Sequence, residues 1–308
     1  MGIEANEKVT PFRPMYEEDK WVQNAFGFVP TSVWNIPPKD DARLKAFISD
    51  SGDPRGLVRH RYSEHSPLQI RYSEFSSGLA ERVLIYWSEV GHKVVDPFSG
   101  RTTRAAVARL LGRDYEGYEI GPLTHAQTIE NMANLDREHP LDLWSTPLGG
   151  YTLHLGDGCE MAQTPDESAA LAFTCPPYWN IEKYEEIPGQ LSSLGSYNSF
   201  IDLIGKALKN CYRVLKPGGF CVWVVADFRR EGVFYPFHCD VIERMSDAGL
   251  KLHDVIISVL KGPYALFPEY AAEHRYTVKQ HEFIIVGRKP GDQICTPRPN
   301  SENKQTLL

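Results

Sequence analysis

A proline pair flanked by a thiol and two aromatic rings is the first feature of this chain whose residue types could do chemistry. Residues 174–180 read TCPPYWN and follow an apolar run at residues 169–173. Two successive prolines lock their φ angles and donate no backbone hydrogen bond, so a strand formed by the apolar run has to end there. The stiff corner that results points carbonyl oxygens outward beside Tyr178 and Trp179. Such a corner can hold a donor group of a substrate in place, although a rigid aromatic loop without chemistry has the same residues.

Glycines and carboxylates stand where three further strands are expected to end. Residues 96–104 read DPFSGRTTR and follow the first strand, Glu119 ends the second, and Asp157 lies in a Gly-Asp-Gly turn after the third. Gly100 lets the backbone approach a ligand closely, and the carboxylates can accept hydrogen bonds from ribose hydroxyls and an adenine amino group. Since ligands of open α/β sheets bind beyond the carboxyl ends of the strands, we expect a nucleoside site here. The absence of a GxGxxG motif disfavours a dinucleotide.

The elements that would position these residues follow from the apolar spacing, which becomes regular at about residue 75. Helices are predicted at residues 79–87, 103–111, 123–135, 197–215 and 237–248. Strands are predicted at residues 93–96, 115–119, 151–155, 169–174, 220–226, 252–260 and 283–286. This alternation predicts an α/β fold with a doubly wound, seven-stranded mixed sheet, whose last strand is antiparallel because no crossover helix precedes it. Residues 216–219, KPGG, are expected to stop the long helix and reverse the chain.

Three regions are expected along the 308 residues. Residues 1–70 read as an irregular N-terminal extension that wraps the main domain or forms part of a binding face, residues 71–289 as the catalytic domain, and residues 290–308 as a disordered tail. The six cysteines are scattered without a CxxC pair, which disfavours a disulfide framework and a structural zinc. No apolar run is long enough to span a bilayer and no secretory signal opens the chain, so a cytoplasmic protein is expected.

Taken together, these segments resemble the S-adenosylmethionine-dependent amino-methyltransferases of DNA, a family that modifies N4 of cytosine or N6 of adenine. Residues 96–103 are similar to the family's cofactor loop DPFxGxGT, and residues 174–179 to its catalytic segment, TSPPYW or DPPY. Residues 75–87 are similar to the helix that contacts the cofactor ahead of that loop, and the segment FGFVPTSVW resembles phage-type members. The resemblance covers residues 70–289 and implies a class I, Rossmann-like methyltransferase fold.

The resemblance implies one site for S-adenosyl-L-methionine and one for the target base. The expected cofactor-binding residues are Phe75, Asp96, Pro97, Phe98, Ser99, Gly100, Thr102, Thr103, Glu119, Ile120, Asp157 and Gly158. The expected catalytic residues are Thr174, Cys175, Pro176, Pro177, Tyr178 and Trp179. In that arrangement the Pro176 carbonyl accepts a hydrogen bond from the exocyclic amine, Tyr178 stacks on a flipped base, and Trp179 lines the pocket. Two positions depart from the family pattern: Thr102 replaces the loop's second glycine, and Cys175 replaces Ser, Asp or Asn.

Double-stranded DNA is the partner that the resemblance implies, with no metal and no membrane. The net charge of −7 counts against nucleic-acid binding unless cations gather locally, because phosphates need cationic contacts. The candidate DNA-binding residues are Arg55, Arg59, Arg61, Arg71, Arg275 and Lys279. A restriction-enzyme partner and a homodimer are both compatible with the resemblance.

Several alternatives remain open for the reaction itself. Cytosine N4 is favoured because cysteine is closer in shape to serine, which precedes PPYW in cytosine-type segments, and adenine N6 is the alternative. A substrate of RNA or a small nucleobase compound would suit the negative charge, and a catalytically inactive DNA-binding or scaffold member would suit the two departures at Thr102 and Cys175. Attack of Cys175 on the cytosine ring is disfavoured, since the signature of that chemistry resembles Pro-Cys and not Cys-Pro.

Overall fold

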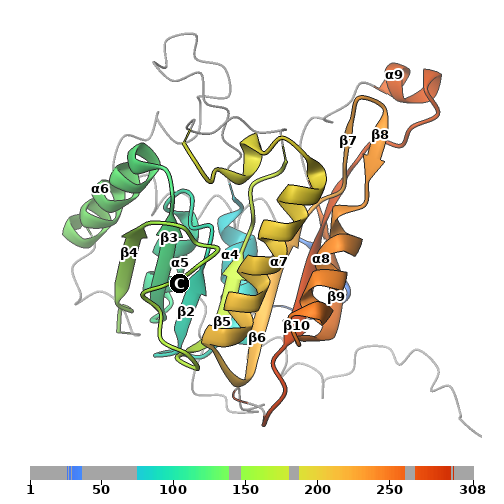
Figure 1. Ribbon diagram of the computed structural model, residues 1–308. Helices are drawn as coiled ribbons and strands as arrows, with labels where there is room; N and C mark the ends of the chain where they lie inside the picture. The colour runs from blue at the N-terminus through green and yellow to red at the C-terminus, as the bar shows by residue number, and fades with distance from the viewer. Residues whose placement is uncertain are drawn as a thin grey trace, which may run out of the picture.

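A computed structural model describes residues 26, 28, 30–36, 75–138, 147–179, 187–260, 268–292 and 294. Within these residues an eight-stranded sheet has the order β1-β9-β10-β6-β5-β2-β3-β4 (Figure 1). Its strands are β1 Val33–Asn35, β2 Lys93–Asp96, β3 Asp114–Glu119, β4 Tyr151–Leu155, β5 Ala169–Thr174, β6 Leu215–Val225, β9 Lys251–Val259 and β10 His281–Arg288. Every neighbouring pair is parallel except the two made by β10. The seven expected strands and the antiparallel last strand are therefore confirmed, and β1 adds an eighth.

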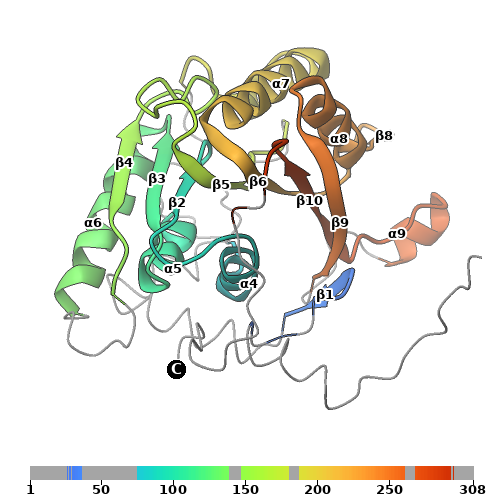
Figure 2. The same cartoon turned by 90° about the horizontal axis from the view of Figure 1, so that it is seen from below.

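Helices cover both faces of the sheet, as expected for a doubly wound fold (Figure 2). One face carries α4 Ser77–Trp87, α5 Thr103–Leu110 and α6 Pro122–Glu138, and the other carries α7 Tyr197–Val214 and α8 Phe237–Asp247. Successive residues of the central strands point to opposite faces, so Val94 packs beneath the first group of helices and Val95 beneath the second. Strands buried on both faces read as continuous apolar runs, which is why the sequence located them well. No helix of the described residues is long and apolar enough to cross a membrane.

The edge strand β1 was not predicted. It pairs in parallel with β9, with Val33 opposite Ile257. Trp34 anchors it, because its buried ring stacks on Trp87 of α4 at 5.6 Å and meets Phe28 edge-on at 5.3 Å. A part of the N-terminal region thus completes the sheet. Arg55, Arg59, Arg61 and Arg71 lie outside the described residues, and the expected division into three regions stays a prediction.

The long helix stops and the chain reverses close to residues 216–219, as predicted, but these residues do not form a separate turn. Helix α7 ends at Val214 and β6 begins at Leu215, so these four residues form the start of the strand. The register between β5 and β6 shifts here, between Ala169 and Leu171, which accommodates the extra residues as a bulge. Gly218 is left-handed with φ of 82°, and its amide donates to the carbonyl of Lys289 just after β10. The glycine therefore serves close packing within the sheet and does not end a helix.

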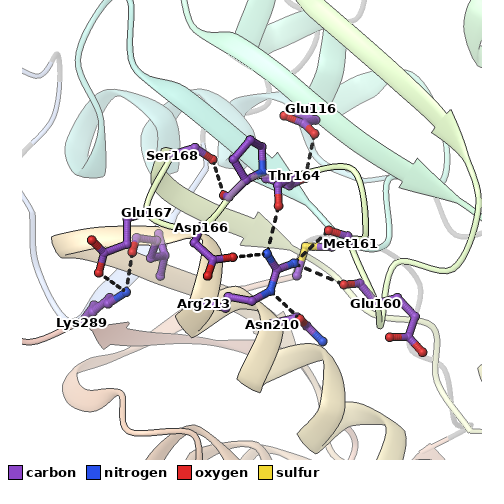
Figure 3. Close-up of polar contacts among 12 residues, drawn as sticks. Glu116, Glu160, Met161, Thr164, Asp166, Glu167, Ser168, Asn210, Arg213 and Lys289 are labelled. Carbon is purple, nitrogen blue, oxygen red and sulfur yellow. Dashed lines mark hydrogen bonds and ion pairs between the residues drawn. The ribbon is translucent and has the colours of Figure 1, made fainter.

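The connection from β4 to β5 contains no helix and is fastened by Arg213 of α7 (Figure 3). The Arg213 guanidinium donates to the carbonyls of Thr164 at 3.0 Å and Met161 at 2.9 Å, and pairs with Asp166 at 2.6 Å. Thr164 in turn donates a 2.7 Å hydrogen bond to Glu116 of β3. These contacts hold residues 161–166, the later part of a long loop, whereas the candidate site residues Asp157 and Gly158 lie at its start.

Three short elements complete the described fold. They are β7 Phe228–Arg230 and β8 Val233–Tyr235, which form a separate hairpin between β6 and α8, and α9 Pro268–Glu273 before β10. A single 3-10 turn, Leu191–Ser193, precedes α7. None of these was expected from the sequence, because β7, β8 and the 3-10 turn have only three residues each and α9 only six, too few to show a period.

Candidate functional site

The segments singled out in the sequence converge at the carboxyl ends of β2, β3, β4 and β5. These strands are parallel, so their ends lie along one edge of the sheet. The amide of Ser99 donates to the carbonyl of Tyr118 at 2.8 Å, and the amide of Gly156 donates to the carbonyl of Glu119 at 2.9 Å. The loops after β2 and β4 are thereby both attached to the end of β3.

Asp96, the last residue of β2, joins the cofactor-like loop to the proline corner. Its fully buried carboxylate accepts hydrogen bonds from the hydroxyl of Thr174 at 2.6 Å and from the amide of Phe98 at 3.0 Å, both at Oδ1. The other oxygen accepts from the hydroxyl of Tyr115 at 2.7 Å and from Arg104 Nε at 2.6 Å. Since both oxygens are engaged, the carboxylate fastens the loop to the end of β5. Direct contact of Asp96 with a cofactor stays a prediction.

Arg104 is a site residue that sequence reasoning missed. It lies buried in the first turn of α5 and donates through Nη2 to the carbonyls of Phe98 at 2.6 Å and Ser99 at 3.2 Å. Burial would lower the pKa of its guanidinium, but the Asp96 carboxylate raises that pKa above the ordinary value. Its guanidinium also lies 4.9 Å from the ring centre of Phe75. The sequence did contain a signal for this role, an arginine in the first turn of a largely apolar helix. A cation is unfavourable at that position unless an acidic partner lies close by.

Close backbone packing shapes the loop after β2. Gly100 is left-handed with φ of 52°. A Cβ at Gly158 would lie 1.6 Å from the carbonyl oxygen of Pro97, so only glycine fits where the loop after β4 crosses the loop after β2. Thr102, in place of the family's second glycine, is buried and accepts a 2.9 Å hydrogen bond from the Asn131 amide of α6. This departure therefore ties the loop to α6, with the adjacent Thr103 opening α5.

The two predicted carboxylates stand at neighbouring strand ends. Glu119 is half-buried and accepts a 2.7 Å hydrogen bond from the amide of Gly121, while Asp157 is exposed and accepts a 2.8 Å bond from the amide of Cys159. Ile120 lies half-buried beside Glu119. Phe75, the aromatic residue expected ahead of the loop, meets Phe173 of β5 edge-on at 5.8 Å. The structure thus brings an aromatic ring, a glycine-lined loop and two carboxylates to the same sheet edge.

The proline corner begins at the last residue of β5. Thr174 is fully buried, and its hydroxyl proton is committed to Asp96. The Cys175 thiol is half-buried and packs against the core on the α4 side of the sheet, Pro176 is buried and Pro177 is half-buried. Within the described part of the chain, no hydrogen bond is made to the Pro176 carbonyl.

The two aromatic residues of the corner belong to a larger aromatic cluster. Trp179 is buried, its indole nitrogen donates to the carbonyl of Leu194 at 2.8 Å, and its ring contacts Tyr235 of β8 at 5.4 Å. The half-buried Tyr178 ring meets Phe228 of β7 edge-on at 6.2 Å. The expected corner therefore forms, and the β7–β8 hairpin packs directly on it.

Two of the candidate DNA-binding residues fall within the described residues. Arg275 is exposed with a left-handed φ of 56°. Lys279 pairs at 2.9 Å with the buried carboxylate of Asp227, which follows β6. No group of three or more potential metal ligands occurs among the residues that the structure describes.

An open, mainly parallel sheet whose loops meet at the strand ends is the architecture of Rossmann-like α/β proteins. A family model described as DNA methylase, covering N6 and N4 methyltransferases, matches residues 6–130 and 169–307. Because these segments make up most of the 308 residues, the chain belongs to this family of DNA methylases. The resemblance drawn from residues 96–103 and 174–179 is thereby confirmed.

Individual relatives match over shorter segments. The chain is 33% identical to the type II methyltransferase M.BamHI of Bacillus amyloliquefaciens over 85 residues, which are 27% of this chain and 18% of that protein. It is 24% identical to the type II methyltransferase M.MthZI of Methanothermobacter thermautotrophicus over 165 residues, 46% of this chain and 45% of that protein. The matches thus span less than half the length of these relatives. A SAM-dependent methyltransferase structure from Methanosarcina mazei aligns with 68% of this chain and 98% of its own, at 12% identity and a TM-score of 0.46.

Proposed function

We propose that this chain transfers a methyl group from S-adenosyl-L-methionine to the exocyclic amine of a base in double-stranded DNA, with cytosine N4 as the favoured target. The observation that carries the proposal is the 2.6 Å hydrogen bond from Thr174 to Asp96. This bond joins the loop proposed for the cofactor to the corner proposed for the amine. Methyl transfer needs the methyl group and the amine in fixed relative positions, which such a connection provides.

The residues at the sheet edge fit S-adenosylmethionine. Glu119 can accept hydrogen bonds from ribose hydroxyls, as a carboxylate at the end of the second strand does in nucleotide-binding sheets. The exposed Asp157 can accept from the adenine amine, and the close packing of Gly158 on Pro97 holds Asp157 beside the loop after β2. The bound cofactor supplies a methyl group already activated by a sulfonium. The task left to the chain is to position and polarise the amine.

The proline corner can perform that task. An exocyclic amine is a weak nucleophile because its lone pair is delocalised into the base. A hydrogen bond from the amine to the Pro176 carbonyl would favour a pyramidal nitrogen whose lone pair points toward the methyl group, and the two prolines hold that carbonyl rigidly. Thr174 donates its proton to Asp96, so it acts as a positioning residue. A thiol is a weak hydrogen-bond acceptor, so the Pro176 carbonyl is the main acceptor for the amine and Cys175 contributes less.

The choice of base rests on Cys175. Its side chain has the shape of serine more than of aspartate, which favours cytosine N4, and adenine N6 is the second candidate because the family includes both. Membership of a DNA methylase family disfavours RNA, a small nucleobase compound and an inactive scaffold as alternatives. The type II methyltransferases among the relatives make a restriction enzyme the partner to look for, and a homodimer stays a prediction.

Product identification tests the proposal. Unmethylated genomic DNA is incubated with the full chain and labelled S-adenosylmethionine, digested to nucleosides, and analysed by mass spectrometry. We expect N4-methylcytosine. N6-methyladenine would overturn the choice of base while keeping the reaction class, and the absence of any methylated nucleoside, with S-adenosylhomocysteine binding intact, would overturn the proposed reaction.

A further inference from the structure

The β7–β8 hairpin projects from the fold and has no role in the methyl transfer proposed above. It forms a two-stranded sheet of its own and projects with α9 beyond the main sheet, at the upper right of Figure 1. Its turn consists of Glu231 and Gly232, with φ of 51° and 79°. Two successive left-handed residues make the tight turn whose twist matches a β-hairpin, so the tip is held in one conformation.

The base of the hairpin packs against the proline corner. Phe228 of β7 stacks on Tyr235 of β8 at 5.2 Å, and these two rings contact Tyr178 and Trp179 respectively. The Arg230 guanidinium lies 4.7 Å from the Trp179 ring. The hairpin therefore has a fixed position relative to the residues proposed to hold the target base.

Two exposed apolar side chains follow the turn of the hairpin, at the start of β8. Val233 is 54% exposed and Phe234 39% exposed. Two cations flank the Phe234 ring, because Arg229 lies 5.0 Å and Lys279 Nζ 5.1 Å from its centre. The acidic residue of the turn, Glu231, lies 3.5 Å from Arg230 and is thus paired within the hairpin.

An exposed ring between cations, beside a proposed base pocket, suits the DNA duplex. Proteins that distort DNA insert apolar side chains between base steps, and neighbouring cations contact the phosphates. Flipping a base also requires its stacking and pairing to be broken, at a cost that is lower for a mismatched base. An apolar wedge next to the pocket would lower that cost.

We propose that the β7–β8 hairpin enters duplex DNA beside the target base, with Phe234 as the wedge and Arg229 on the flanking phosphate. The inference rests on the proposed function. It assigns to this hairpin the step that separates the target base from its neighbours, while the proline corner and the cofactor loop act on the base after it has left the stack.

The test compares Phe234→Ala on two duplexes once the methylated site has been mapped. One duplex carries a normal pair at the target base and the other a mismatch. We expect kcat/KM of the variant to fall at least roughly tenfold on the paired duplex and to return close to the wild-type value on the mismatched one, since the mismatch supplies what the wedge does. Affinity for S-adenosylhomocysteine should be unchanged.

Two further variants make the result specific. Phe234→Leu keeps an apolar side chain and should retain most activity on the paired duplex. Leu252→Ala removes a side chain that is 51% exposed at the start of β9, away from the strand ends that carry the candidate site. It should change kcat/KM on neither duplex. An equal loss on both duplexes, or no loss on the paired one, would overturn the wedge. If the wild-type chain methylates neither duplex, it is the proposed function that has failed.

Discussion

At the scale of single residues, the geometry of the site depends on Asp96. Its buried carboxylate is stable only because donors surround it, and those donors come from the loop after β2, α5, β3 and β5. Tyr115 remains a donor at ordinary pH, because burial, followed by the neighbouring Asp96, raises the pKa of its hydroxyl well above the usual range. Among the donors, Thr174 is expected to matter most for the proposed reaction, since it directly precedes the proline corner.

Replacing Thr174 by valine is expected to lower both stability and methyl transfer. Valine keeps the shape of threonine but removes one donor from a buried carboxylate, at a cost of about 1–3 kcal/mol in the free energy of unfolding. This hydrogen bond between the corner and the loop proposed for the cofactor is then lost, and the rate of the proposed transfer should fall by roughly tenfold to a hundredfold. Urea unfolding and single-turnover methylation measure the two effects.

Thr164→Val is the matched control for this prediction. Thr164 is also buried and donates a 2.7 Å hydrogen bond to a carboxylate, Glu116, outside the proposed site. It should lose a similar stability and keep the rate per folded molecule. Equal losses of rate in the two variants would mean that Thr174 contributes stability alone.

The sequence located the residues of the candidate site that stand at strand ends better than those that lie inside an element. Asp96, Glu119 and Thr174 were located because each stands at the end of a readable strand. Arg104 and Tyr115 were missed, since each reaches Asp96 from within another element, and only the packing of α5 and β3 against β2 shows that their side chains meet it.

At the scale of elements, the candidate site is made of loops that cross at close range. The loop after β4 passes over the loop after β2 where Gly158 meets Pro97, and it is attached to β3 through Gly156. With no helix between β4 and β5, these contacts and the hydrogen bonds of Arg213 determine where the loop lies. A change at the crossing should therefore move the residues proposed to hold the nucleoside.

Gly158→Ala should weaken cofactor binding. The added Cβ would meet the Pro97 carbonyl at 1.6 Å, so one of the two loops has to shift. Overpacking of this kind costs about 1–3 kcal/mol of stability, and the displaced loop should reduce affinity for S-adenosylhomocysteine by tenfold or more, as measured by titration calorimetry. Gly156→Ala is the control two residues earlier, because a Cβ there has nothing within 4 Å. Unchanged affinity in Gly158→Ala would place the cofactor away from this crossing.

The elements that the sequence located are those with strong boundaries. The strand Tyr151–Leu155 has its predicted limits because glycines lie on both sides of it. The strand Ala169–Thr174 has its predicted limits because two prolines closely follow it. The strands it missed among the described residues are β1, β7 and β8, each of three residues. Their stability comes from Trp34 and from the aromatic cluster, which are tertiary contacts that a local pattern does not contain.

At the scale of the whole molecule, the proposed binding of DNA has to overcome a net charge of −7. Long-range attraction to DNA is thus not expected, and affinity must come from cations placed at the contact itself. Within the described residues such cations gather near the hairpin. Arg229 lies 4.1 Å from the ring of Tyr276, which places the neighbouring, exposed Arg275 close to the same surface.

Salt dependence tests whether that surface meets phosphate. The logarithm of affinity falls with the logarithm of salt concentration, and each neutralised phosphate makes this slope steeper by about 0.9. If Arg275 contacts a phosphate, Arg275→Gln should reduce the steepness by about one and weaken duplex binding. The control is Lys251→Gln. It removes an equal charge from an exposed residue at the start of β9, away from the strand ends that carry the candidate site. Because both variants change the net charge equally, a general electrostatic effect would alter both slopes alike. A lower slope in Arg275→Gln alone would locate the duplex beside the hairpin, and equal slopes in the two variants would exclude Arg275 from the contact.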